Sequence, residues 1–430
     1  MNTSNAMSSC LSPLVRALVA IIGGGLVLLG LVTPLFYVII PFAIDVDESR
    51  ITMNVLVAGL GVMATILGVL LFYQGLRSLL ARRSGALRFP HARWVIVLGG
   101  GLFALTVLCG MVVLLPGGIV SAYVFPPFHV VAQALPPLIA LSLAGWAVFP
   151  RRPTAEKLHA PTWRQLTSQL AYGSVGAVSL SMFLEVVLLV LLFLFVLVFV
   201  LLIPGRLAVW EELVGIIQSN PYWQEDADLL RQVLAMPETL VMLGAVALVI
   251  APLTEETVKA LGVALMCHRV RSAGTALVFG LACGAGFAVA ESLLNGAGAM
   301  DPLEWGSVAV LRFGSSLMHC LTGALMGLGW YYAIWRRQPG RLLGAYLLSL
   351  GIHFVWNVLA SAMGMVPVLI GEGGALPLSD VVAVSLALLL LVYTAVMLMG
   401  LLLLARRVRP APLGSNRDLP EMSKFPDPIS

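Results

Sequence analysis

Residues 186–203 read VVLLVLLFLFVLVFVLLI, an apolar run without a charge or a proline. As an α-helix, a run of this length nearly spans the hydrocarbon core of a bilayer, which is about 30 Å thick, because the helix rises about 1.5 Å per residue. The rest of the chain is similar in kind. Of its 430 residues, 60% are hydrophobic and 11% are charged, and the mean hydropathy is +0.98. Soluble proteins average about 25% charged residues, so the sequence predicts a polytopic membrane protein.

Ten segments are long and apolar enough to cross the membrane as helices. They are residues 14–40, 53–76, 94–116, 127–149, 176–203, 239–267, 275–297, 306–335, 341–363 and 380–405. The expected fold class is therefore all-α, a membrane helix bundle of about ten transmembrane helices. The first apolar run is longer than that of a cleaved signal peptide, which has about 7–15 residues, and we expect it to remain as a span.

The Lys and Arg residues lie mostly in loops on one side of the predicted bundle. With a cytoplasmic N-terminus, twenty of the 25 fall in cytoplasmic segments, whereas Arg50, Arg206 and Arg231 fall outside. Only Lys259 and Arg312 lie within spans. Cytoplasmic loops of membrane proteins carry such an excess, so both termini are predicted to be cytoplasmic. The absence of an organellar signal favours a multi-pass protein of the cell membrane, the bacterial inner membrane in particular.

Polar segments divide the chain into candidate parts. These are a four-span membrane region at 1–150, a cytoplasmic linker with a short amphipathic helix at 151–175, a six-span membrane domain at 176–407 with its core at 239–363 and an outer loop at 205–238, and a disordered cytoplasmic tail at 408–430. The tail is predicted from its Pro, Ser and charge content. The dispersed basic residues argue against a nucleic-acid partner, and the five unpaired-looking cysteines argue against a disulfide framework.

Ionisable side chains at membrane depth are concentrated in four consecutive spans. Each costs about 2.5–3.5 kcal/mol at the centre of a bilayer on insertion scales, so such residues usually mark a function. In chain order, the polar residues of these four spans are Glu255, Glu256 and Lys259, then Glu291 and Asn295, then Arg312 and His319, then His353 and Asn357. Within each span they recur at intervals of three, four or seven residues and so share one helix face. The sequence therefore predicts that four polar faces meet in one site.

The residue types in this cluster suit hydrolysis. Three carboxylates close together in a low dielectric are not expected all to be ionised, so one can serve as a general base near neutral pH. The two histidines provide proton relay or oxyanion donation, and Asn357 donates to a developing oxyanion or orients His353. Lys259 and Arg312 are expected to be counter-ions, and Asn295 is expected to form a helix-packing hydrogen bond.

Two ionisable residues lie in spans outside the cluster. Glu185 is expected to pair with another group or to extend toward the membrane surface, which is the usual role of an isolated charge in a span. His129 follows the sequence FPPF and is expected at the membrane interface. Neither is assigned to the predicted site.

Four short segments resemble the motifs of the PrsW intramembrane proteases, a family related to the CAAX-prenyl-protease and bacteriocin-processing superfamily. The segments are EETVK at 255–259, GFAVAESLLN at 286–295, RFGSSLMH at 312–319 and HFVWN at 353–357. Lys259 stands where the superfamily more often has Arg, and Ser292 stands where Asn is commoner. Neither departure removes a proposed catalytic group.

The resemblance implies an intramembrane endopeptidase that cleaves a single-pass membrane protein within the lipid bilayer. Characterised members act on membrane-anchored anti-sigma factors. The matching positions carry over Glu255, Glu256, Glu291, His319 and His353 as catalytic residues and Asn357 as the oxyanion or orienting partner. The six-span domain is then the catalytic one.

The use of a metal stays open at this point. The chain has no HExxH, which excludes a thermolysin-type zinc site. His319, His353 and Glu291 would still satisfy the His₂Glu ligation of a divalent metal such as Zn²⁺. A metal-free mechanism, in which a glutamate activates water directly, fits the charges as well, and we favour it. The alternative function is a proton-coupled transporter that uses the buried Glu, His, Lys and Arg residues, but no repeat relates the two halves of the chain.

Overall fold

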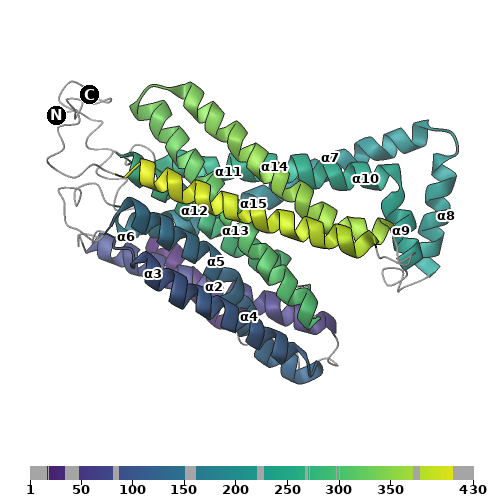
Figure 1. Ribbon diagram of the computed structural model, residues 1–430, viewed down its shortest axis with the longest axis horizontal. Helices are drawn as coiled ribbons and strands as arrows, with labels where there is room; N and C mark the ends of the chain where they lie inside the picture. Colours follow the sequence, from purple (N-terminus) through teal and green to yellow (C-terminus); the bar gives the residue numbers. More distant parts are fainter. Residues whose placement is uncertain are drawn as a thin grey trace.

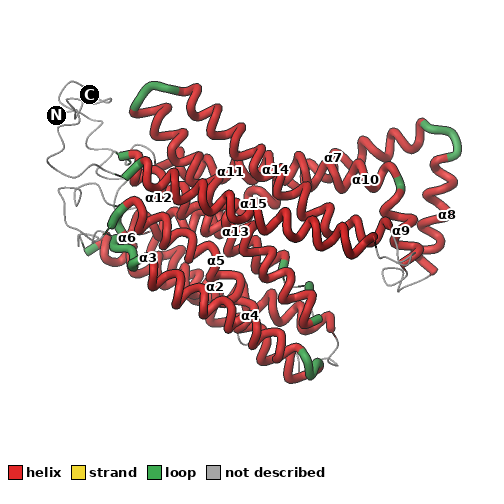
Figure 2. The backbone as a smooth tube through the Cα atoms, viewed as in Figure 1, coloured by secondary structure: helices red, strands yellow, loops and turns green. Residues whose placement is uncertain are grey.

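The computed structural model describes residues 17, 19–33, 48–80, 87–150, 161–219, 227–266, 270, 272–296, 298–299, 301–370 and 378–409. Throughout these residues the chain forms helices joined by short connections, as Figure 2 shows. The all-α prediction is therefore confirmed. The predicted disordered tail from residue 410 onward lies outside the described residues, and so do residues 151–160 of the predicted linker.

The elements follow one another in a simple order (Figure 1). After an apolar helix at Val19–Thr33, the first half contains α2 (Glu48–Leu79), α3 (Ala92–Trp94), η1 (Val95–Gly100), α4 (Gly101–Leu114), α5 (Gly118–Val148), α6 (Trp163–Ala171), η3 (Tyr172–Ala177) and α7 (Val178–Leu202). The second half contains α8 (Arg206–Ser219), α9 (Ala227–Ala235), α10 (Pro237–Gly244), η4 (Ala245–Ile250), α11 (Ala251–Met266), α12 (Ala273–Asn295), α13 (Pro302–Trp335), α14 (Pro339–Ile370) and α15 (Leu378–Arg407). The η segments are π-helical turns.

Nine helices in the described part of the chain are long and apolar enough to cross a membrane. They are Thr52–Leu79, Ala92–Leu114, Ser121–Val148, Trp163–Leu202, Pro237–Met266, Ala273–Asn295, Pro302–Trp335, Pro339–Met365 and Val381–Arg407. These correspond in order to the second through tenth predicted spans. The first predicted span is represented by the shorter helix Val19–Thr33. The cytoplasmic location of the termini stays a prediction from the loop charges.

The fifth span begins earlier than its apolar residues indicate. The short amphipathic helix predicted in the linker is α6, and it continues through η3 into α7 without a break. Thr162 starts α6 with a capping box, in which the Thr162 hydroxyl accepts from the N–H of Gln165 and the Gln165 side chain accepts from the N–H of Thr162. The first turns of this long helix are polar, so hydropathy alone placed the start of the span at residue 176, whereas α6 begins at Trp163.

The centre of the bundle is the hairpin of α12 and α13, around which α5, α11, α14 and α15 lie (Figure 1). Small residues allow the two helices to approach closely, as the GxxxG spacing indicates. A Cβ atom at Gly280 would overlap the carbonyl of Gly323, and one at Gly284 would overlap the carbonyl of His319. The position of His319 therefore depends on direct backbone contact with α12.

Replacing Gly284 with valine is expected to separate α12 from α13 and to lower stability by about 1–3 kcal/mol or more, the usual cost of overpacking a core. The measurement is unfolding of the purified protein in detergent. Gly351→Ala on α14 is the matched control, because a Cβ at Gly351 meets nothing within 4 Å. A Gly284→Val protein as stable as the Gly351→Ala protein would contradict the close packing.

The N-terminal helices pack on the same hairpin. Trp305 of α13 is fully buried against Phe125 of α5, with their ring centroids 5.0 Å apart, and its Nε1 donates to Nδ1 of His129 at 3.1 Å. His129 is thus buried in the bundle, and its position at the membrane interface stays a prediction. Its imidazole is held inside the bundle because the indole of Trp305 offers a buried hydrogen-bond donor, which the local sequence around His129 does not indicate.

Candidate active site

The motif EETVK lies in the first turns of α11, directly after the π-helical turn η4. Pro252 has no N–H to donate into the helical ladder, and a wider turn precedes it. Asn357 of α14 donates its Nδ2–H to the carbonyl of Ala247 in this turn at 2.7 Å. A side chain from a neighbouring helix thus satisfies a backbone carbonyl of the irregular turn.

Glu255 and Glu256 have different surroundings although they are adjacent. Successive residues of an α-helix point about 100° apart. Glu255 lines a cavity of about 300 Å³ together with His319 and His353. Glu256 is fully buried and does not border this cavity. The two carboxylates therefore have distinct roles available to them.

Glu256 and Lys259 form the buried link between the two histidines. Oε1 of Glu256 lies 2.6 Å from Nζ of Lys259 and 2.8 Å from Nδ1 of His353. Nζ of Lys259 lies 2.7 Å from Nδ1 of His319, and it also stands 4.7 Å from the ring centroid of Phe287. The expected pairing of Lys259 with Glu256 is thus present, and it extends to both imidazoles.

These contacts assign the protons of the two imidazoles. A lysine ammonium has only donors, so Nδ1 of His319 accepts from Lys259 and the ring carries its proton on Nε2. A carboxylate has only acceptors, so Nδ1 of His353 donates to Glu256, which leaves a lone pair on Nε2 of His353. That nitrogen lies 4.0 Å from Oε2 of Glu255.

Glu291 is fixed by groups from two helices. Its Oε1 accepts from Arg312 of α13 at 2.7 Å and from Asn295 of α12 at 2.9 Å. Its Oε2 lies 2.5 Å from Nε2 of His319, although the angles of this contact are outside those of a hydrogen bond. Arg312 is therefore the counter-ion of Glu291, and Asn295 bonds within its own helix instead of joining two helices.

The cavity collects seven of the nine predicted residues, all except Glu256 and Lys259, and adds Glu185, Ser315 and Ser361. Its polar lining is Glu185, Glu255, Glu291, Asn295, Arg312, Ser315, His319, His353, Asn357 and Ser361. Glu185 belongs to α7, outside the four motif helices, and its carboxylate accepts from the hydroxyl of Thr254 at 3.0 Å. The sequence feature that could have indicated a role for Glu185 is its charge, which stands alone in a long apolar span.

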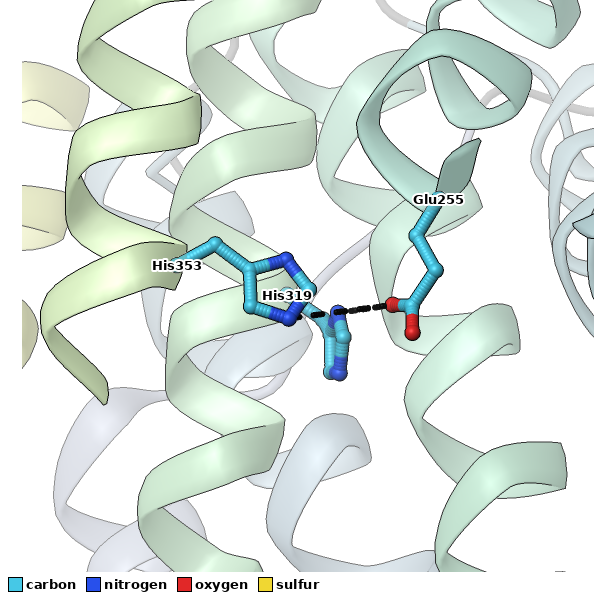
Figure 3. A group of neighbouring side chains, drawn as sticks. All are labelled: Glu255, His319 and His353. Carbon is cyan, nitrogen blue, oxygen red and sulfur yellow. Dashed lines mark ion pairs between the residues drawn. The ribbon is translucent and has the colours of Figure 1, made fainter. Parts of the chain in front are cut away.

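Glu255, His319 and His353 form the group best placed to hold a metal ion. One ligand atom from each residue lies within 4.8 Å of those of the other two. Figure 3 shows their side chains converging from α11, α13 and α14. Oε2 of Glu255 has no hydrogen-bond partner among the described residues, and two histidines with one glutamate are the donors of many catalytic zinc sites. The carboxylate in this group is Glu255, whereas the ligand set predicted from the sequence included Glu291.

The family model described as PrsW family intramembrane metalloprotease matches residues 161–399, more than half of the chain. The chain belongs to the PrsW family. The match includes all four motifs and confirms the resemblance drawn from them. Membership in the PrsW family makes the chain an intramembrane peptidase, and the nine apolar helices agree with a multi-pass membrane protein. No curated protein and no solved structure matches the chain.

The PrsW match also bears on the N-terminal boundary. It begins at residue 161, beside the capping box that starts α6 and ahead of the boundary predicted at 176. The helices before it still contact the family region, because α5 packs against both α12 and α13. The division of the chain into parts stays a prediction. The N-terminal helices α4 and α5 pack against the hairpin of α12 and α13.

Proposed function

We propose that this PrsW-family protease hydrolyses a peptide bond in a single-pass membrane protein with a water molecule activated by Glu255. The observation that carries this proposal is the position of Oε2 of Glu255, which borders the cavity 4.0 Å from the free lone pair on Nε2 of His353. Two acceptors at this separation leave room for one water that donates a hydrogen bond to each. Glu255 takes the water proton as the oxygen attacks the scissile carbonyl, and returns it to the leaving nitrogen.

The remaining polar groups are suited to stabilise the oxyanion of the tetrahedral intermediate. An amide nitrogen carries two N–H groups, and Asn357 uses one of them on Ala247. Its second N–H is the donor we assign to the oxyanion, because Nε2 of His319 already lies against the carboxylate of Glu291. Glu256 orients the imidazole of His353, and Lys259 orients that of His319. The ion pair of Glu291 with Arg312 determines the local charge beside His319. In this assignment the catalytic residues touch the reacting atoms, whereas Glu256, Lys259 and Arg312 are positioning residues.

The family description raises the question of a metal, and the residues present fit one. Glu255, His319 and His353 would hold it, since their donor types and spacing suit a divalent ion such as Zn²⁺. A neutral imidazole has one lone pair, so His319 would bind the ion only after losing its hydrogen bond from Lys259. Such an ion would supply Lewis-acid polarisation of the scissile carbonyl. Elemental analysis of the purified protein, with activity measured before and after chelation, determines its occupancy and its contribution.

The location of the cavity among membrane helices supports a membrane-anchored substrate, and the resemblance to characterised PrsW proteases suggests its class. We propose an anti-sigma-factor-like protein with one membrane anchor, cleaved in the bacterial inner membrane by the region 176–407, with 1–150 as its supporting layer. The proton-coupled transporter is the weaker candidate, because the family match supports a peptidase. The buried glutamates and histidines can supply the general base and the hydrogen bonds that peptide hydrolysis needs.

The test of this function is reconstitution of the full chain in liposomes with a single-span reporter. We expect one new peptide bond to be cut within or beside the reporter span, as located by mass spectrometry. An intact reporter together with uptake of solute driven by a pH gradient would favour the transporter instead.

A further inference from the structure

Glu185 lies at the boundary between the cavity and the surface of α7 that the bundle leaves uncovered. Its side chain contributes to the cavity lining. Its neighbours on α7 are exposed, with Phe183 at 64% and Val186 at 58%, as expected of a helix that faces lipid. The carboxylate is therefore positioned at the edge of the cavity, on a helix that carries none of the four motifs.

The charges around the cavity leave Glu185 without a counter-ion. Among the described lining residues, Arg312 is the one with a permanent positive charge, and it pairs with Glu291 at 2.7 Å. Lys259 lies behind the cavity wall and pairs with Glu256 at 2.6 Å. None of the ion pairs in the described residues includes Glu185.

The partner that Glu185 does have is a neutral hydroxyl. Thr254 donates to its Oε1 and shares the same hydroxyl with backbone carbonyls one turn earlier. Charges inside a membrane protein are usually paired, because a carboxylate away from water is stabilised by a nearby cation. On the same cavity, Oε2 of Glu255 and Oε2 of Glu291 are buried carboxylate atoms without a hydrogen-bond partner in the part of the chain that the structure describes.

We propose that Glu185 is a specificity-determining residue that binds a cationic side chain, Lys or Arg, of the substrate next to the bond that is cut. This inference rests on the proposed peptidase function. The small residues Ala247, Ala251 and Ala360 border the same cavity and leave room for the apolar stem of a long basic side chain. The charged end then reaches Glu185, in the way that long basic side chains place their heads at a polar group beside lipid.

The test uses the full chain in liposomes and a set of single-span reporters. Each position within six residues of the scissile bond is replaced in turn by Lys, Met or Glu, and kcat/KM is measured for every reporter. At one position we expect the wild-type enzyme to prefer Lys over Met. Glu185→Gln keeps an oxygen that accepts from Thr254 but removes the charge, and it should reduce this Lys-to-Met ratio by about 10- to 100-fold.

Two further variants test whether the change in preference is caused by the charge at residue 185. Glu304→Gln removes an exposed carboxylate from the same bundle and should leave the ratio unchanged. Glu185→Lys should shift the preference at that position from Lys toward Glu. Equal losses for Lys and Met reporters in Glu185→Gln, or a wild-type enzyme with no preference for Lys, would overturn the inference while leaving the peptidase function intact. Failure of the wild-type enzyme to cleave any reporter would instead count against the proposed function.

Discussion

Glu255→Gln is expected to lower kcat/KM for a membrane-anchored reporter by about 10²- to 10⁴-fold, the contribution typical of a general base. The amide cannot take the water proton, and it offers an N–H where the carboxylate offers a lone pair. The substitution changes neither size nor the packing of α11, because the Glu255 side chain borders the cavity. The measurement is initial cleavage rate against reporter concentration in liposomes.

The control for this experiment is Glu304→Gln, which removes an exposed carboxylate of the same chain and should retain wild-type activity. Unfolding in detergent shows whether Glu255→Gln keeps its fold. A Glu255→Gln enzyme with normal stability and near-normal cleavage would eliminate Glu255 as the water-activating group and transfer attention to Glu291, the other carboxylate beside His319.

Lys259→Met is expected to destabilise the protein by about 3–5 kcal/mol, the usual effect of removing one partner of a buried ion pair. Methionine has similar length and no charge, so the change leaves Glu256 buried without its cation and removes the donor to His319. The measurement is the free energy of unfolding in mixed micelles. Cleavage should be lost as well, because both imidazoles lose their orientation.

A double-mutant cycle separates the ion pair from simple loss of packing. Adding Glu256→Gln to Lys259→Met removes the unpaired charge, so the double variant should be more stable than Lys259→Met alone. Arg406→Met, at an exposed cation near the end of α15, should have little effect. Strictly additive losses from Glu256→Gln and Lys259→Met would show that the two side chains are not coupled.

Hydropathy and the positions of the charged residues were sufficient to predict most of the membrane-spanning helices. Nine predicted spans correspond to helices because about twenty apolar residues have few alternatives in a membrane protein. The start of the fifth span was misplaced because polar residues of α6 continue the same helix, as the capping box at Thr162 shows. Such a continuation depends on tertiary packing of α6 and η3 against α12, which hydropathy does not report.

The site could be predicted to the level of helix faces but not to individual atoms. The spacing of polar residues indicates which side of each helix is polar. It does not indicate which of Glu255 and Glu256 borders the cavity, since that depends on the rotation of α11. Glu185 could not be assigned because one carboxylate has no periodicity, and its proximity to Thr254 joins residues far apart in the sequence.

The hydrogen bond from Asn357 to Ala247 has a consequence for how the enzyme admits its substrate. It joins α14 to the turn before α11, and a sliding movement between these two helices would break it. The pair is thus expected to move as one rigid unit during turnover. Separation of α7 from α11, which it contacts, would leave this hydrogen bond intact, so α7 is the side on which we expect a substrate segment to enter.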